Sequence, residues 1–205
     1  MIRNIYPNGF KKEALFWINK PAKCNIEADQ ITITTEPGTD LWQKTYYGFQ
    51  NDNAHMLQIN TLEKFFSFTV KTSFCGSHRF DQCGIVLYLD SQNWLKASSE
   101  YENTEYQRLG SVVTNYGYSD WATTDISAEI HSLWYRLSRR DSDYCIEYSM
   151  DGMNYKQMRI CHLCEGDREV SLGVYACSPE LSSFEAVFTN AEFTECKWNA
   201  HHGGF

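Results

Sequence analysis

Polar and apolar residues alternate along most of the chain with a period of two. Such alternation is typical of β-strands, whose successive side chains point to opposite faces. Turn-forming residues separate the segments about every ten residues, as in β-sandwiches and barrels. The pattern predicts strands at residues 22–27, 31–35, 56–60, 64–74, 82–90, 93–101, 108–115, 133–140, 143–149, 155–160, 169–177 and 184–194.

The predicted fold is all-β with little helix. Asp151-Gly152 is the clearest hairpin turn, because Gly takes positive φ without steric cost. Only residues 125–132 indicate a short helical turn. We expect a single β-sandwich domain over residues 1–205, with its core at about 14–195 and loosely held ends at 1–13 and 199–205.

Charge narrows the range of partners. The net charge of -8 and the pI of about 5.2 argue against binding to nucleic acid or to an anionic membrane, since both need clustered Lys and Arg. No apolar run approaches the roughly 20 residues of a membrane span, and no signal-peptide pattern opens the chain. We expect a cytoplasmic protein without nucleic-acid or membrane partners. The sequence leaves its oligomeric state open.

The chain has 8 cysteines, which we expect to be reduced thiols because no export signal is evident. Cys161-His162-Leu163-Cys164 is the one metal-like spacing, and no second ligand pair completes a zinc site. The Asp residues are scattered and form no dense calcium-binding loop. We therefore expect no metal and no cofactor.

The segment from Trp94 to Glu100 carries the most distinctive chemistry. Alternation places Trp94, Lys96 and Glu100 on one face of a strand. Lys96 and Glu100 would lie about 13 Å apart at about 3.3 Å per residue, too far for an ion pair. They could contact different parts of one ligand, with Trp94 as a flat surface for a sugar ring. The alternative is a solvated face with one exposed tryptophan.

Two further pairs of an acid and a tryptophan accompany that strand. Asp40 precedes Trp42 by two residues, and Asp120 is adjacent to Trp121. Carbohydrate sites combine aromatic faces with carboxylates that accept hydrogen bonds from hydroxyl groups, so these pairs predict a groove. The alternative is that a tryptophan such as Trp42 fills the core.

Arg136 and Glu147 alternate with apolar neighbours on what we predict to be adjacent strands. They could form a cross-strand ion pair, and such pairs are usually structural and modest. The functional alternative is that Arg136, with Lys96, contacts an anionic group of a ligand.

Glycoside cleavage would need two carboxyl groups, about 5–5.5 Å apart for retention or about 6.5–9.5 Å for inversion. Glu100 is the candidate catalytic residue, with Glu102, Asp120 or Glu147 as its partner. The sequence contains no nucleophile elbow, phosphate loop or dinucleotide fingerprint.

Short motifs spread over roughly residues 14–195 occur in the same order as in a known protein family. They are Thr39-Asp40-Leu41-Trp42, Tyr47-Gly48-Phe49, Asp81-Gln82-Cys83-Gly84, Trp94-Leu95-Lys96 with Glu100, Ser111-Val112-Val113-Thr114, Ser119-Asp120-Trp121, Tyr148-Ser149-Met150-Asp151-Gly152 and Cys177-Ser178-Pro179. As a set they resemble domain of unknown function 1349, also called regulation-of-enolase-protein-like, in the concanavalin A-like lectin/glucanase superfamily. The resemblance implies a jelly-roll sandwich of two curved antiparallel sheets with a cleft on its concave face. It says little about activity.

Three functions follow as expectations. The leading one is binding of a carbohydrate or phosphosugar on the concave face, with Asp40, Trp42, Trp94, Lys96, Glu100, Asp120, Trp121, Arg136 and Glu147 as candidate ligand-binding residues. The second is a glycoside-active enzyme using Glu100. The Glu-x-Asp-x-x-Glu strand of laminarinase-type relatives is absent from the sequence, which counts against classical glucanase chemistry. The third is a regulatory module that binds a protein partner in sugar metabolism.

Overall fold

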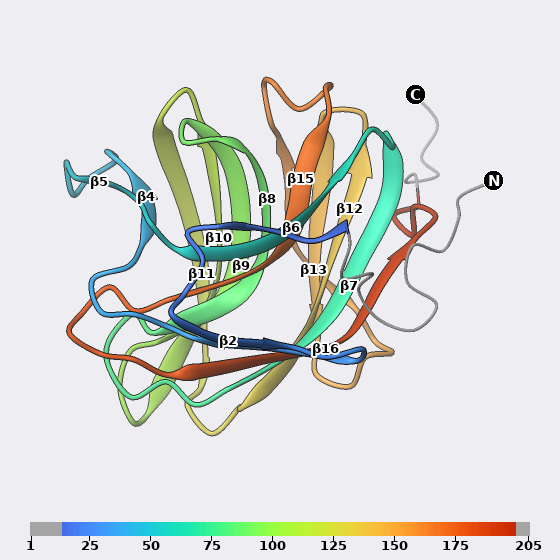
Figure 1. The fold of residues 1–205 in the computed structure, drawn as a ribbon. Helices are drawn as coiled ribbons and strands as arrows, with labels where there is room; N and C mark the ends of the chain where they lie inside the picture. The colour runs from blue at the N-terminus through green and yellow to red at the C-terminus, as the bar shows by residue number, and fades with distance from the viewer. Residues whose placement is uncertain (1–13, 200–205) are drawn as a thin grey trace.

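The computed structural model describes residues 14–199. Within this range the chain forms two seven-stranded antiparallel sheets and a separate two-stranded hairpin, with no α-helix (Figure 1). The predicted jelly-roll sandwich is confirmed. None of the residues from 14 to 199 belongs to a helix with the length and hydrophobicity needed to cross a membrane.

The first sheet carries the candidate site. In spatial order its strands are β1 (Phe16–Ile18), β6 (His55–Thr61), β15 (Val170–Cys177), β8 (Gln82–Asp90), β9 (Asn93–Tyr101), β10 (Tyr106–Asn115) and β11 (Tyr118–Ser127).

The second sheet closes the sandwich. Its strands, in spatial order, are β14 (Lys156–His162), β13 (Asp143–Ser149), β12 (Ser132–Arg140), β7 (Phe65–Phe74), β16 (Glu185–Thr194), β3 (Gln30–Thr34) and β2 (Lys23–Ile26).

The main core lies between the two sheets, where alternate residues of each strand meet. Leu95 and Ala97 of β9 face it from the first sheet, and Phe68 and Leu137 face it from the second. Removing such apolar surface from water stabilises the fold by about 25 cal/mol per Å². The sandwich thus follows directly from the alternation in the sequence.

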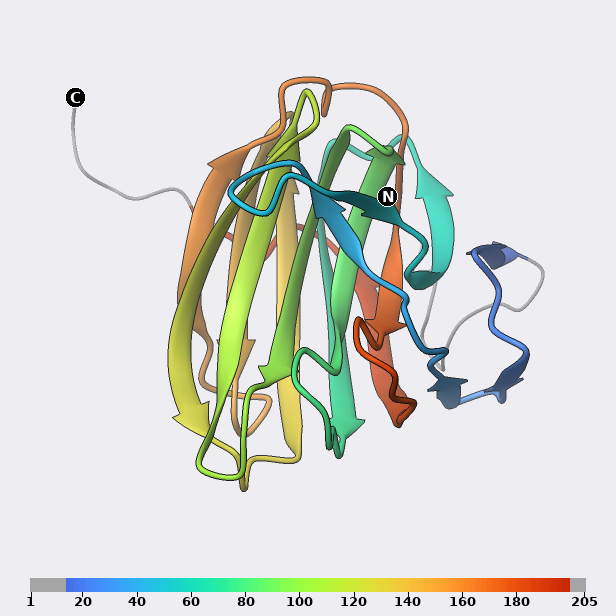
Figure 2. The same ribbon diagram turned by 90° about the vertical axis from the view of Figure 1, so that its left-hand side faces the viewer.

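The outer face of the first sheet is partly apolar, and a second layer covers part of it. The covering segment, residues 39–54, contains the hairpin of β4 (Leu41–Gln43) and β5 (Gln50–Asp52). Figure 2 looks onto this face, and the blue covering segment crosses in front of the strands. Trp94, Val86 and Val112 pack beneath it in a second buried cluster. Strand β9 is therefore buried on both faces.

All twelve predicted strands are present. The Asp151-Gly152 turn joins β13 to β14, with Gly152 at a φ of 76°. Strands β1, β4, β5 and β11 were not predicted from the sequence. The predicted helical turn at residues 125–132 is wrong, because that segment is the end of β11, a turn and the start of β12.

The expected loose ends lie mostly outside the described residues, which exclude 1–13 and 200–205. The single domain over residues 1–205 stays a prediction.

Candidate functional site

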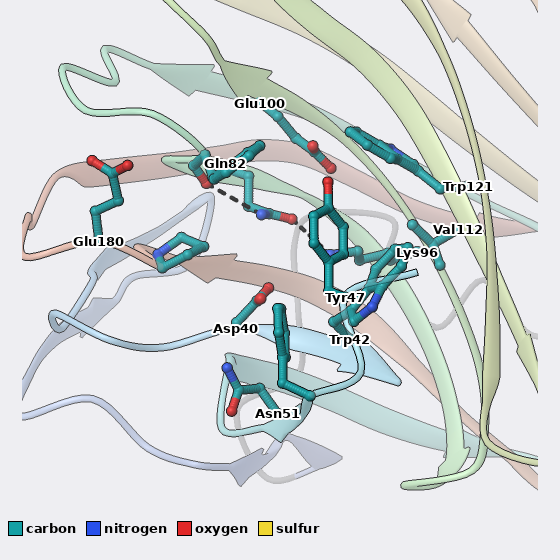
Figure 3. Close-up of a pocket in the computed structure, with 13 residues that line it drawn as sticks. Asp40, Trp42, Tyr47, Asn51, Gln82, Lys96, Glu100, Val112, Trp121 and Glu180 are labelled. Atoms are coloured by element: carbon teal, nitrogen blue, oxygen red, sulfur yellow. Dashed lines mark hydrogen bonds between the residues drawn. The ribbon is translucent and has the colours of Figure 1, made fainter. Parts of the chain in front are cut away.

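A pocket of about 360 Å³ opens on the outer face of the first sheet, beside the covering segment. Strands β8, β9 and β10 supply its floor, and β11, the covering segment and the loop after β15 supply its walls (Figure 3). Its lining consists of Asp40, Trp42, Tyr47, Phe49, Asn51, Phe80, Gln82, Lys96, Glu100, Val112, Trp121, Pro179 and Glu180.

One wall of the pocket is a continuous series of aromatic rings. The Trp42 ring lies edge-on to Trp121 at 6.2 Å and to Tyr47 at 5.5 Å between ring centres. Tyr47 in turn lies 5.7 Å from Phe49. Gly110 leaves room for the Trp121 indole, because a Cβ there would lie 3.0 Å from its Nε1. The wall therefore offers flat apolar faces at fixed angles.

The tight turn between β4 and β5 sets the position of Tyr47. Lys44, Tyr46 and Gly48 all have positive φ, and the Lys44 amide donates to the Phe49 carbonyl at 2.8 Å. Non-glycine residues in this conformation are strained, and strained backbone is concentrated at functional sites. The turn directs Tyr47 into the pocket (Figure 3) and leaves Tyr46 exposed.

A hydroxyl group attaches this hairpin to the first sheet. The Gln43 amide of β4 donates to Ser119 Oγ of β11 at 3.0 Å. Ser119 Oγ also bonds to Thr114 Oγ1 of β10 at 2.8 Å. The aromatic wall is thereby tied to the edge of the sheet.

The floor contains a buried ammonium group. Lys96 is 2% exposed, and its Nζ donates to Gln82 Oε1 at 2.8 Å. The Tyr175 hydroxyl donates to the same oxygen at 3.0 Å. Lys96 Nζ also lies 5.5 Å from the centre of the Tyr175 ring and 6.0 Å from that of Trp94. These contacts hold the ammonium group in place without an ion pair among residues 14–199.

Two carboxyl groups enter the pocket from different sides. Glu100 is 4% exposed and Asp40 is 8% exposed. Ser98 Oγ donates to Glu100 Oε1 at 3.2 Å, and the Leu41 amide donates to Asp40 Oδ1 at 2.7 Å. Figure 3 shows both groups directed into the pocket.

The pKa of Glu100 is raised above its ordinary value. Desolvation by burial is the largest cause, and the negative charge of Asp40 also raises it. Lys96, the Ser98 hydrogen bond and Arg108 act in the opposite direction and do not cancel the desolvation. Glu100 thus holds its proton to higher pH than an exposed glutamate.

A third buried carboxylate, Asp81, joins the two loops at the rim. Its Oδ2 accepts from the amides of Ser77 and His78, each at 3.0 Å. Its Oδ1 accepts from the hydroxyls of Ser178 at 2.8 Å and Ser182 at 2.6 Å. These four bonds position Phe80 on one side of the rim and Pro179 and Glu180 on the other.

The structure gathers five of the nine predicted binding residues into this pocket: Asp40, Trp42, Lys96, Glu100 and Trp121. Trp94 shares the face of Lys96, as predicted, but is 0% exposed, so its ring offers no surface to a ligand. The covering segment lies over it.

The other three candidates lie outside the pocket lining. Asp120 pairs with Arg159 at 2.9 Å, with its side chain 78% exposed. Arg136 and Glu147 form the predicted cross-strand pair at 2.7 Å on the second sheet. Glu102, suggested as a partner for Glu100, instead pairs with Arg79 at 2.8 Å and Arg108 at 3.1 Å.

Several lining residues were not predicted, notably Tyr47, Phe49 and Gln82. Their signal was present, because all three lie in the motifs that carry the family resemblance. The acid opposite Glu100 is Asp40, which the glycoside hypothesis did not consider.

The cysteines are free thiols. Burial raises the pKa of Cys161 to about 12, and its neighbour His162 bonds to Asp143 at 2.7 Å. No group of three or more His, Cys, Asp and Glu side chains able to hold a metal ion occurs between residues 14 and 199.

The fold and pocket define a β-sandwich protein with a partly aromatic site on one sheet. The family described as "Protein of unknown function (DUF1349)" matches residues 17–196. The chain is also 31% identical over 188 residues to "Regulation of enolase protein 1" of Saccharomyces cerevisiae, covering 91% of this chain and 92% of that protein. The chain belongs to the DUF1349 family.

Solved structures agree with this fold. A functionally unknown protein from Saccharomyces cerevisiae superposes with a TM-score of 0.83 at 30% identity, covering 89% of this chain and 97% of that one. A xylan beta-1,4-xylosidase from Bacillus halodurans superposes with a TM-score of 0.67 at 10% identity, covering 86% of this chain and 35% of that one. The second likeness shows the fold alone.

The Asp81 bonds predict a strong dependence of stability on this carboxylate. We expect Asp81→Ala to lower the free energy of unfolding by at least about 3 kcal/mol, because four donors, of which the Ser178 and Ser182 hydroxyls are buried, lose a charged acceptor. Urea denaturation measures the change. The control, Asp120→Ala, removes an exposed ion pair and should cost at most about 1 kcal/mol. Equal effects of the two variants would contradict this role for Asp81.

The raised pKa of Glu100 predicts an unusual dependence of the protein's stability on pH. Its pKa in the folded state is raised, so the native protein retains a proton that the unfolded chain releases. Stability should fall as pH rises from the ordinary pKa to the raised one. We expect Glu100→Gln to remove this decline and to raise the melting temperature at neutral pH. Thermal unfolding at a series of pH values measures both, and parallel curves for the two proteins would refute the expectation.

Proposed function

We propose that the protein binds a carbohydrate or sugar derivative in the pocket. The observation that carries the proposal is the aromatic wall of Trp42, Tyr47 and Trp121 beside a floor of buried polar groups. Aromatic faces suit the C–H surfaces of a sugar ring, and fixed polar groups select the orientation of its hydroxyls.

The size and polarity of the site support this proposal. A volume of about 360 Å³ falls within the range of about 300–1,000 Å³ that is usual for small-molecule pockets. Gln82 and Lys96 are already hydrogen-bonded to each other, so the floor is preorganised. Preorganised groups lose little entropy when a ligand binds.

The comparisons support a connection to sugar metabolism. The name of the yeast relative refers to the regulation of an enolase. We propose a cytoplasmic role in sugar metabolism for this chain. Regulation through a protein partner is compatible with sugar binding in the pocket.

Sugar binding predicts a selective effect of Tyr47, whose ring contributes to the aromatic wall. We expect Tyr47→Ala to weaken binding at least about tenfold, because one stacking contact is lost. Titration calorimetry with a ligand found in a panel of mono- and oligosaccharides and phosphosugars measures this. The control, Tyr118→Ala, removes an exposed ring outside the lining and should leave the affinity unchanged. Failure of the whole panel to bind would refute the proposal.

A glycoside-active enzyme is the second candidate, and the raised pKa of Glu100 favours it. A general acid that works near neutral pH needs a pKa above its ordinary value. Asp40, which enters the same pocket from another wall, would be the second carboxyl group.

Catalysis predicts a loss of turnover in carboxyl variants. We expect Glu100→Gln to lower kcat at least about 100-fold, since a general acid contributes about 10²–10⁴. Release of reducing sugar from aryl glycosides and oligosaccharides measures turnover, with Asp120→Asn as the control. If the wild-type protein binds such a substrate without cleaving it, the enzyme hypothesis is eliminated.

A further inference from the structure

Asp40 and Glu100 each have one carboxyl oxygen bonded within the protein and one that is not. The bonds given above use Asp40 Oδ1 and Glu100 Oε1. In the part of the chain that the structure describes, the second oxygen of each group has no hydrogen-bond partner. Both side chains are more than nine-tenths buried and are directed into the same cavity (Figure 3). These two oxygens keep access to the pocket, so a ligand there can donate hydrogen bonds to them in place of water.

The charges of the lining favour a cation. Three carboxyl groups, on Asp40, Glu100 and Glu180, line the pocket, against one ammonium group, on Lys96. Lys96 is the least accessible of the four and is already bonded to Gln82. An anionic ligand such as a phosphosugar would bring further acceptors to a site that already has unpaired acceptors.

The aromatic wall strengthens this preference. Trp42, Tyr47 and Trp121 line the same pocket as the carboxyl groups. The faces of aromatic rings attract cations, by about 0.5–2 kcal/mol depending on desolvation. A cation would therefore interact favourably with both the carboxyl groups and the rings.

We propose that the ligand is a sugar with a protonated amino group, which donates to the unpaired oxygens of Asp40 and Glu100 while the sugar ring packs on the aromatic wall. This inference rests on the proposed function and specifies the class of sugar. It predicts that an amino sugar binds more tightly than a neutral sugar, and that both bind more tightly than a phosphosugar.

Binding of the amino group also affects the ionisation of Glu100. A cation beside this residue favours its charged form, so binding should release a proton where Glu100 is protonated in the free protein. The titratable groups that interact with Glu100 are Asp40, Lys96, Arg108, Tyr135, Tyr175 and Cys177.

The test compares sugars that share one ring and differ in charge. Glucosamine, glucose, N-acetylglucosamine, glucuronate and glucose 6-phosphate are titrated into the full chain by calorimetry at slightly acidic pH. We expect glucosamine to bind at least about tenfold more tightly than glucose, because it gains a charge-assisted hydrogen bond. N-acetylation should remove the advantage. Repeating the titration in buffers with different ionisation enthalpies measures the released proton.

Variants connect the preference to the two carboxyl groups. Asp40→Asn should bring the affinity for glucosamine to within about threefold of that for glucose, because the charge is lost and the shape is kept. Asp120→Asn, a matched change outside the lining, should preserve the preference. Melting temperatures of both variants verify folding.

The panel of sugars separates failure of this inference from failure of the proposed function. Equal affinity for glucose and glucosamine, or tightest binding of glucose 6-phosphate, would overturn the amino-sugar inference and leave carbohydrate binding intact. Binding of none of these sugars would overturn the inference, and the larger panel described above would then decide the proposed function.

Discussion

The pocket depends on the buried carboxylate of Asp81, which joins two loops that are far apart in the sequence. It accepts bonds from Ser77 and His78 on one side and from Ser178 and Ser182 on the other. A charged group buried this deeply is stable only when its oxygens are hydrogen-bonded. The requirement to satisfy Asp81 therefore brings Phe80 and Pro179 to the same rim, and a cavity remains between them and the covering segment.

Strand β9 of the first sheet illustrates which features of the site could be predicted from the sequence and which could not. Alternation along β9 correctly placed Lys96 and Glu100 on one face, because the period of a strand is local. The burial of Trp94 on that face could not be predicted, because the residues that cover it come from the remote segment around Leu41 and Trp42. A strand covered on both faces differs from a half-exposed one only through such distant contacts.

The missed strands have a related explanation. Strand β11 lies at the edge of the first sheet, and most of its residues are exposed, so Ala122, Thr123 and Thr124 show no apolar alternation. Its pairing with β10 is nevertheless regular over ten residues. Strands β1, β4 and β5 have only three residues each, too few to show a period. The predicted pair of Arg136 and Glu147 was found because both strands alternate clearly.

The contact between Gln43 and Ser119 affects the cooperativity of the molecule. One hydroxyl group connects the hairpin that carries the aromatic wall to the outermost strand of the sheet and, through Thr114, to the strand beside it. Local unfolding proceeds through contiguous cooperative units. Detachment of the hairpin breaks this contact with the edge strand, so we expect a molecule held against Tyr47 to slow amide hydrogen exchange around Ser119, which it does not need to touch.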